Sequence, residues 1–312
     1  MWISQIKQYN MRILRILLIS LPFFVFGQAD TAFSLPYQLD TPVRQLKVDD
    51  ALKEISGLSM SPNEEFLIAI QDELGSLFYL DKQTGEIVKE VSFWKEGDYE
   101  GIELVGDDIY VVKNTGTLYC ISNAGKEDQE VTKYNGFLSS DDNIEGLTYW
   151  PQENKLLLAS KAQAHPKSDG CQQRAIYAFD LDSAEMIPTP FMEMKRSKVD
   201  HYMEYEHHCS GECKICSLFD EDKNDFKLSP AAVAIHPIDE QVYILSANGN
   251  LLIVVSMNGE IQLITKLPKK LHRQPEGLCF DAAGNMYISN EERKEHEANV
   301  VVYTYERSRD RG

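Results

Sequence analysis

The chain has 312 residues, of which 43% are hydrophobic and 26% charged, so it is long enough for one large or two ordinary globular domains. Its net charge is −18 at pH 7. Because such a surface repels phosphate backbones and anionic lipid, we expect no nucleic-acid partner.

Residues 1–27 have the pattern of an export signal. Arg12 and Arg15 precede the apolar run ILLISLPFFVFG at 16–27, and polar sequence follows. An apolar core of this length is too short to span a bilayer stably. We therefore expect cleavage after this segment and an exported protein in the periplasm, at the cell surface or secreted. The alternative is an uncleaved signal that keeps the protein at the membrane.

Residues 28–312 are predicted to form a single all-β domain. Short runs rich in β-branched and aromatic residues, such as EEFLIAI, SLFYLD and DDIYVVK, alternate with glycine-containing turns such as NTG and ANG. Outside the signal, no segment has the sustained periodicity of an amphipathic helix.

One phrase recurs at regular intervals. It reads EISGLSM at 54–60, DYEGIEL at 98–104, NIEGLTY at 143–149, SPAAVAI at 229–235 and QPEGLCF at 274–280. Measured from Gly57, Gly101, Gly146, Ala232 and Gly277, the intervals are 44, 45, 86 and 45 residues. A four-stranded unit of about 40–50 residues is typical of a β-propeller blade.

The long interval leaves two blade counts open. Residues 195–228 contain no blade start and few strand-like runs, so we interpret them as a Cys-rich insertion and favour five blades. A degenerate sixth blade is the alternative. The segment 32–48 precedes the first unit and is expected to supply a strand that closes the ring.

These units resemble those of the SdiA-regulated (YjiK-like) family of exported or membrane-attached bacterial propellers. The resemblance extends from about residue 45 to 305. It implies a central calcium site and a distant relationship to calcium-dependent lactonases and phosphotriesterases. The family has no established reaction, and the Cys-rich insertion departs from its plainer members.

The innermost strand of every blade lines the central channel, so equivalent residues should converge there. The position before the glycine is occupied by Ser56, Glu100, Glu145, Ala231 and Glu276, and the position two residues earlier by Glu54, Asp98, Asn143, Ser229 and Gln274. Clustered carboxylates either take up protons or hold a cation, and an oxygen-only set suits Ca²⁺. We therefore predict a Ca²⁺ site with Glu100, Glu145 and Glu276 as its core, reinforced by Asp98, Asn143 and Glu54. The alternative is that these groups only cap strand ends.

Polar residues at the ends of the second strands form a second predicted ring. These candidates for ligand binding are Asp72, Asn114, Lys161, Asn248, Asn290 and Glu291. The alternative is that they belong to ordinary hairpin turns.

The remaining cysteines and histidines give weaker signals. Two disulfides are the favoured state of Cys171, Cys209, Cys213 and Cys216 in an exported protein, with a Zn²⁺ site or free thiols as alternatives. We expect Cys120 and Cys279 to be buried in strands. His236 and His272 are expected at the surface, with a position near the channel as the alternative.

Three functions remain open from the sequence. The first is a calcium-binding propeller of the cell envelope that binds a small molecule or an envelope protein at one face. The second is a calcium-dependent hydrolase of esters, lactones or phosphoesters, in which the cation polarises the substrate and a channel carboxylate acts as base. The third is a scaffold that docks a partner through the Cys-rich insertion. We expect a monomer in each case.

Overall fold

The computed structural model describes residues 33–162, 173–207, 214–219 and 226–306. These residues belong to one compact unit. The predicted export signal at 1–27 lies outside them, as do Cys171, Cys209 and Cys213. Within the described ranges, no helix is both long and apolar enough to cross a membrane.

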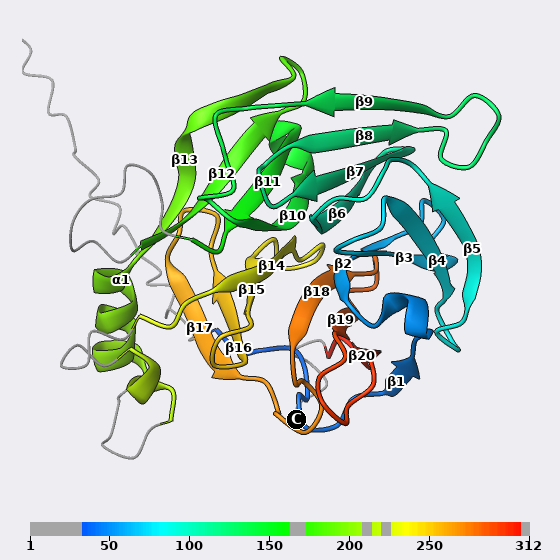
Figure 1. Cartoon of the computed structure of the whole chain (residues 1–312). Helices are drawn as coiled ribbons and strands as arrows, with labels where there is room; N and C mark the ends of the chain where they lie inside the picture. Colours follow the sequence, from blue (N-terminus) through cyan, green and yellow to red (C-terminus); the bar gives the residue numbers. More distant parts are fainter. Residues whose placement is uncertain (1–32, 163–172, 208–213, 220–225, 307–312) are drawn as a thin grey trace, which may run out of the picture. The chain divides into compact units, whose positions relative to one another are not determined.

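The described strands form five antiparallel sheets of four strands each, and each sheet is one blade of a β-propeller (Figure 1). Blade 1 contains β2 (Ile55–Met60), β3 (Phe66–Gln71), β4 (Ser76–Asp81) and β5 (Ile87–Ser92). Blade 2 contains β6 (Tyr99–Val105), β7 (Asp108–Lys113), β8 (Leu118–Ser122) and β9 (Glu130–Tyr134). Blade 3 contains β10 (Ile144–Trp150), β11 (Lys155–Ser160), β12 (Gln173–Asp180) and β13 (Glu185–Lys195).

The last two blades complete the ring. Blade 4 contains β14 (Pro230–Ile235), β15 (Val242–Ser246), β16 (Leu251–Val255) and β17 (Ile261–Lys266). Blade 5 contains β18 (Pro275–Phe280), β19 (Met286–Asn290), β20 (Asn299–Tyr303) and, as its outermost strand, β1 (Arg44–Lys47). The predicted propeller, its five blades and its closing N-terminal strand are therefore confirmed. The sixth-blade alternative is wrong, because blade 3 and the insertion fill the long interval.

The inner strands β2, β6, β10, β14 and β18 surround the centre, and each contacts the inner strands of the two neighbouring blades (Figure 1). Close approach requires the glycines of the repeat. A Cβ on Gly101 would lie 2.9 Å from the backbone nitrogen of Leu147 in the next blade, and one on Gly146 would lie 2.7 Å from that of Val233. The repeated glycine therefore allows the backbones of adjacent inner strands to approach each other closely near the axis.

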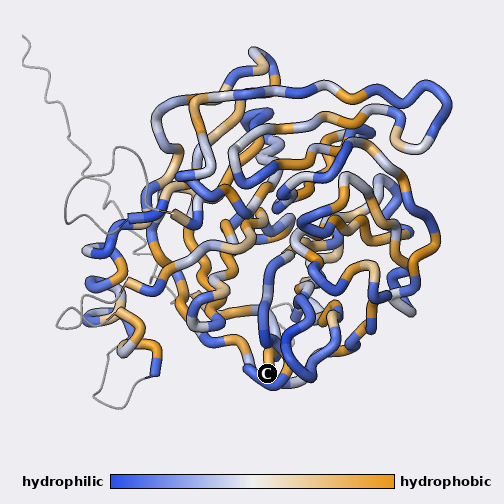
Figure 2. Tube along the Cα trace, viewed as in Figure 1, coloured by the Kyte–Doolittle hydropathy of each residue, from blue (hydrophilic) through white to orange (hydrophobic). Residues whose placement is uncertain are grey.

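Apolar side chains fill the spaces between neighbouring blades. Leu58 and Met60 of blade 1, for example, belong to the same buried cluster as Tyr287 and Val300 of blade 5. Hydrophobic segments follow the strands, whereas many connecting loops are hydrophilic (Figure 2). Burial of these faces is the main stabilising contribution in a fold of this kind.

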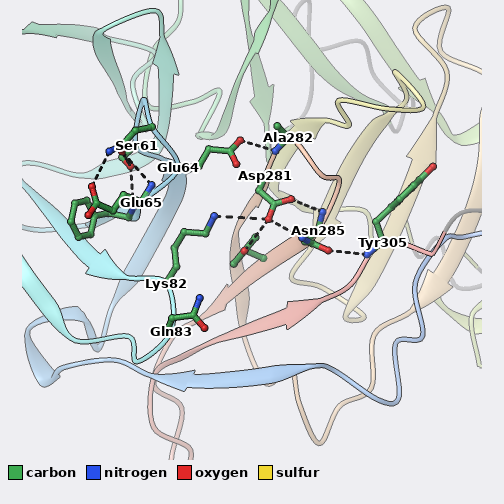
Figure 3. Close-up of polar contacts among 12 residues, drawn as sticks. Ser61, Glu64, Glu65, Lys82, Gln83, Asp281, Ala282, Asn285 and Tyr305 are labelled. Carbon is green, nitrogen blue, oxygen red and sulfur yellow. Dashed lines mark hydrogen bonds and ion pairs between the residues drawn. The ribbon is translucent and has the colours of Figure 1, made fainter.

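Polar contacts also join the first blade to the last (Figure 3). Glu64, from the β2–β3 turn, accepts the backbone N–H of Ala282 at 2.7 Å. Lys82 of blade 1 lies 3.9 Å from the carboxylate of Asp281, which in turn accepts the side-chain amide of Asn285. These contacts supplement the closing strand β1 where the ring ends meet.

The segment after β13 contains short helical elements. These are α1 (Arg196–His201), a π-helical turn at Tyr202–Glu206 and a 3-10 turn at Cys216–Leu218; further 3-10 turns occur at Asp50–Leu52 and Pro151–Glu153. Val199 and Met203 pack into the core cluster that also contains Ile264 of blade 4, and the Tyr202 hydroxyl accepts the Ile264 N–H at 3.3 Å. A six-residue helix is too short to give the sustained periodicity of an amphipathic helix, so α1 was not visible in the sequence.

Candidate functional site

The residue before each repeat glycine is set apart by a β-bulge. In all five inner strands the pairing register shifts across this position, for instance between Tyr99 and Gly101 and between Pro275 and Gly277. A bulged residue has no partner across the ladder, and its side chain is directed away from the regular alternation. The five bulged residues are Ser56, Glu100, Glu145, Ala231 and Glu276.

The three bulged glutamates meet at one small cavity on the propeller axis. Glu100, Glu145 and Glu276 line it together with Ser56 and residues of the five inner strands. Its volume is about 10 Å³, which is about the space of one water molecule. Glu145 and Glu276 are only 5% and 7% exposed. The predicted convergence of these carboxylates is therefore present in the structure.

Burial makes ionisation of these glutamates unfavourable. Burial and the neighbouring Glu145 raise the pKa of Glu100 to about 10. Burial also raises the pKa of Glu276 to about 8, although Lys161 opposes the shift. The pKa of Glu145 is raised by burial as well, and Lys161 again opposes it. At neutral pH the group therefore retains protons unless a cation compensates its charge.

Lys161 supplies one such cation. It follows β11, and its Nζ lies 3.2 Å from Oε2 of Glu145. Burial lowers the pKa of Lys161, but Glu145, Glu276 and Glu100 raise it more, so the amine is charged. On the other oxygen of Glu145, the Asn143 amide donates a hydrogen bond of 2.7 Å. One ammonium is thus shared among three buried carboxylates.

A second ring lies directly beside the first. In every blade the backbone N–H after the second strand donates to the carbonyl two residues before the bulged position. The pairs are Asp72 with Glu54, Asn114 with Asp98, Lys161 with Asn143, Ala247 with Ser229, and Glu291 with Gln274. The two sets predicted from the repeat are therefore adjacent at one mouth of the channel.

Carboxylates dominate this mouth. Burial, Asp72 and Glu54 raise the pKa of Glu291 to about 7, and Gln274 donates its amide to that carboxylate. Burial and Glu54 raise the pKa of Asp72, one of whose buried carboxylate oxygens has no hydrogen-bond partner. In blade 2, Asn114 donates its amide to Asp98. The mouth is consequently acidic on the sides formed by blades 1, 2 and 5.

Two predicted members of this ring are placed differently. Asn248 is exposed and follows Ala247, which holds the equivalent position in blade 4. Asn290 is buried, and its amide group contacts His272 at 3.1 Å and Asn299 at 3.1 Å. The side chain of Asn290 therefore supports the fold beside the mouth. Blade 4 contributes no charged side chain to either ring.

The expected surface positions of two histidines are wrong. His236 and His272 are both fully buried. His272 lies between Asn290 and the hydroxyl of Tyr303, which is 2.8 Å from its Nε2, and burial lowers its pKa to about 4. His236 packs edge-on against Phe280, with ring centroids 4.7 Å apart. Both histidines fill core positions between aromatic residues far apart in the sequence.

The opposite end of the channel holds a residue that the sequence reasoning missed. Glu103 lines a cavity of about 390 Å³ there, together with Ser59 and Cys279. Its carboxylate accepts hydrogen bonds from the Ser59 hydroxyl at 2.9 Å, from its neighbour Leu104 and from Tyr149. The repeat contained an indication of this position, since Ser59, Glu103 and Cys279 each lie two residues after a repeat glycine. With its acceptors occupied, Glu103 joins blades 1, 2 and 3.

The residues at the acidic mouth fit calcium in chemical kind. They offer carboxylate and amide oxygens without sulfur or imidazole, which is the donor set that Ca²⁺ prefers. Within the described ranges, however, no group of three or more His, Cys, Asp and Glu side chains forms a metal site as placed.

The cysteines divide into two groups. Cys120 and Cys279 are buried free thiols in β8 and β18, as predicted. Cys216 begins the 3-10 turn of the insertion, whereas its three predicted partners fall in the undescribed segments. The choice between disulfides and Zn²⁺ at this cluster stays a prediction.

The sequence matches the SdiA-regulated family over residues 32–166 and 214–293. The chain belongs to this family. The match to the SdiA-regulated family stops at 166 and resumes at 214, so most of the Cys-rich segment falls outside it. No curated protein matches the chain in sequence.

Solved structures similar to this SdiA-regulated protein share its fold. Glutaminyl cyclase of Myxococcus xanthus is 12% identical with a TM-score of 0.54, over 85% of this chain and 96% of that one. The PQQ-bound aldose sugar dehydrogenase of Streptomyces coelicolor is 10% identical with a TM-score of 0.48, over 85% and 98%. At 12% identity, the similarity to glutaminyl cyclase supports the propeller architecture alone and leaves the activity open.

Proposed function

We propose that this protein is a calcium-binding β-propeller of the bacterial cell envelope, which binds a ligand or partner at its acidic mouth. The observation that carries the proposal is the convergence of Glu100, Glu145 and Glu276 on one axial cavity with a single ammonium among them. Blade symmetry places these positions together, but it does not require them to be acidic, since Ser56 and Ala231 occupy the same position in two blades.

The charge balance favours a further cation. Lys161 contacts Glu145 and has to serve Glu100 and Glu276 as well, and burial raises the pKa of both of these glutamates. Two unit charges 4 Å apart interact by about 4 kcal/mol at an effective dielectric constant of 20. Three ionised carboxylates around so small a cavity therefore repel each other strongly. A divalent cation removes this repulsion without requiring the glutamates to remain protonated.

The chain offers two groups of oxygen donors for this role. Glu100, Glu145 and Glu276 would hold the ion, and Asn143, Asp98 and Glu54 would support it from the mouth. Calcium is coordinated by six to eight oxygen atoms, so a bound ion would also have room for an oxygen of the molecule that binds at the mouth. Glu291 and Asp72, at the same mouth, would then set which ligands approach. The predicted export signal supports an envelope location.

The decisive experiment is a metal analysis of the purified full-length protein, combined with melting curves with and without a chelator. We expect bound calcium and a lower melting temperature after its removal, because binding to the folded state alone raises stability. The variants Glu276→Gln and Glu100→Gln should lose most of the calcium-dependent shift. Glu130→Gln is the matched control, because Glu130 is exposed on the outer strand β9.

Two results would oppose the proposal. The first is the absence of both calcium and any chelator effect in the wild-type protein. The second is a calcium-dependent shift that is the same in Glu276→Gln, Glu100→Gln and the control, since the ion would then bind elsewhere.

A calcium-dependent hydrolase is the second candidate. Its supporting observation is geometric: the buried carboxylates face a cavity of about one water molecule, which is the arrangement in which a carboxylate can act as a general base. Panels of esters, lactones and phosphoesters, assayed with calcium and after chelation, test this candidate. If no substrate is turned over under either condition, the binding function alone stands.

A further inference from the structure

A separate cleft lies beside the mouth, at the boundary between blades 4 and 5. Three segments form it: the β15–β16 turn at residues 247–250, the segment 269–273 that precedes β18, and the β19–β20 loop at 293–296. Its volume is about 500 Å³, which is within the range of small-molecule sites.

The charge of this cleft is opposite to that of the protein. Lys269, Arg273, Arg293 and Lys294 line it, and among the described lining residues Glu295 alone is acidic. The chain as a whole carries a net charge of −18. Because cations gathered in one concavity create a local positive potential, we propose that this cationic cleft binds the dianionic phosphate group of a small molecule.

Arg273 is the central residue of the cationic cleft. It lines this cleft as well as a neighbouring cavity of about 430 Å³, so Arg273 borders both. Its Nε is buried and has no hydrogen-bond partner. A buried N–H donor without an acceptor is unfavourable. A phosphate oxygen would supply the missing acceptor, and guanidinium groups match phosphate oxygens with paired hydrogen bonds.

The walls that carry the cations are anchored to the propeller. Arg293 and His296 exchange backbone hydrogen bonds of 2.9 and 3.1 Å, which closes a tight turn around Lys294. The N–H of Glu292 donates to the carbonyl of Lys53 at 2.7 Å. On the facing wall, the Asn250 amide donates to the carbonyl of His272. The backbone positions of the charged residues are therefore fixed before a ligand arrives.

The cleft opens where the acidic rings are interrupted. Ala247 both belongs to the mouth ring and lines the cationic cleft. The corresponding positions of blade 4, Ser229 and Ala231, also carry no charge. An anion is repelled by the carboxylates of the other blades but can approach from this side. The inference goes beyond the proposed function, because it holds whether or not the channel binds calcium.

Phosphate is favoured over a simple carboxylate because of the number of charges. Four cations against one carboxylate leave an excess of three positive charges, of which a monoanion neutralises one and a phosphate monoester up to two at neutral pH. Two of the four cations are arginines, whose planar donors suit a group with several oxygens. The exposed Asn248 adjoins the same wall and offers an amide donor.

The test is a calorimetric titration of the full-length protein with phenyl phosphate in calcium-free buffer. We expect saturable binding with one site, and competition by inorganic phosphate. The double variant Arg273→Gln/Arg293→Gln should weaken binding at least tenfold. The matched control Lys133→Gln/Lys126→Gln also removes two charges, from the β8–β9 region of blade 2, and should bind like the wild type. Melting curves of all variants establish that they are folded.

Three results would overturn the proposal. One is the absence of saturable phenyl phosphate binding to the wild-type protein. Another is equal binding by the double variant and the control, which would assign the effect to overall charge. The third is tighter binding of benzoate than of phenyl phosphate, which would show a carboxylate site. Calcium-independent binding that is lost with Arg273 would support this site even if the channel proved not to bind calcium.

Discussion

The Nζ of Lys161 lies 3.2 Å from Oε2 of Glu145, inside the ring of buried glutamates at the propeller axis. The lysine follows the second strand of blade 3, and the glutamate is the bulged residue of the first strand of the same blade. This pair places a cation of the protein beside the residues proposed to bind calcium. Lys161 and calcium are therefore expected to compete for the same carboxylates.

Replacement of Lys161 tests this competition. In Lys161→Met the ammonium is lost while the length of the side chain is retained, so we expect calcium to bind roughly tenfold more tightly or better. Without calcium the variant should be less stable than the wild type, because Glu145 loses its partner. Calcium titrations monitored by calorimetry give the affinity. Lys113→Met is the control, since Lys113 ends the second strand of blade 2 and its amine lies over the Tyr99 ring.

The stability of calcium-free protein should depend on pH through Glu276. Its pKa is raised from 4.5 to about 8 on folding, so the folded state holds a proton that the unfolded state releases between these values. The stabilisation of the folded state by this proton is complete below about pH 4.5 and is lost as the pH rises through 8. Its size is on the order of a few kcal/mol.

Glu276→Gln isolates this contribution, because glutamine does not titrate. Urea denaturation at pH 5, 6.5 and 8 should show a smaller decrease of the unfolding free energy in the variant than in the wild type, by up to about 1.4 kcal/mol per pH unit. Parallel pH profiles would contradict the assignment. Calcium should flatten the wild-type profile, since the bound ion replaces the proton.

The repeat glycines are expected to be intolerant of a methyl group. In Gly101→Ala the new Cβ would meet the backbone nitrogen and Cβ of Leu147 at 2.9 Å. The resulting overpacking should lower the unfolding free energy by roughly 1–3 kcal/mol. Ala232→Gly is the complementary change in blade 4, which already accommodates a Cβ, and it should cost about 1 kcal/mol or less. Equal effects in denaturant melts would refute the packing argument.

Closure of the ring through β1 can be tested at Leu46. This side chain is 3% exposed and belongs to the cluster between blades 5 and 1. Leu46→Ala should lower the unfolding free energy by about 2–5 kcal/mol. Val88→Ala, at a position on β5 that is 51% exposed, serves as the surface control. A similar, small effect of both changes would show that β1 does not hold the ring closed.

The missed elements share a physical reason. The strands β9 and β13 are the outer strands of their blades, and neither has a clear strand pattern in the sequence. β9 has polar residues on both faces, and β13 contains Pro188 and Pro190, which are tolerated at a sheet edge. Alternation is weak where neither face of a strand is well buried, as in β9, so outer strands give less sequence signal than inner ones.

The histidines show a different limit. A single His in a turn or before a strand has no pattern that reveals its burial. His236 and His272 are enclosed by aromatic residues from segments as distant as Tyr37 and Tyr303. These contacts form only when the N-terminal segment packs against blades 4 and 5. The same holds for the cationic cleft, whose residues come from three separated segments.

The sequence by itself determined the propeller, the five starts of its blades and the ring of Glu100, Glu145 and Glu276, because a repeated phrase in a rotationally repeated fold places equivalent residues around one axis. Only the tertiary structure decided that Lys161 contacts Glu145, that Asn290 supports His272, and that the cations of blades 4 and 5 share a cleft. These relationships depend on the direction of side chains and on contacts between loops, for which the repeat sets no rule.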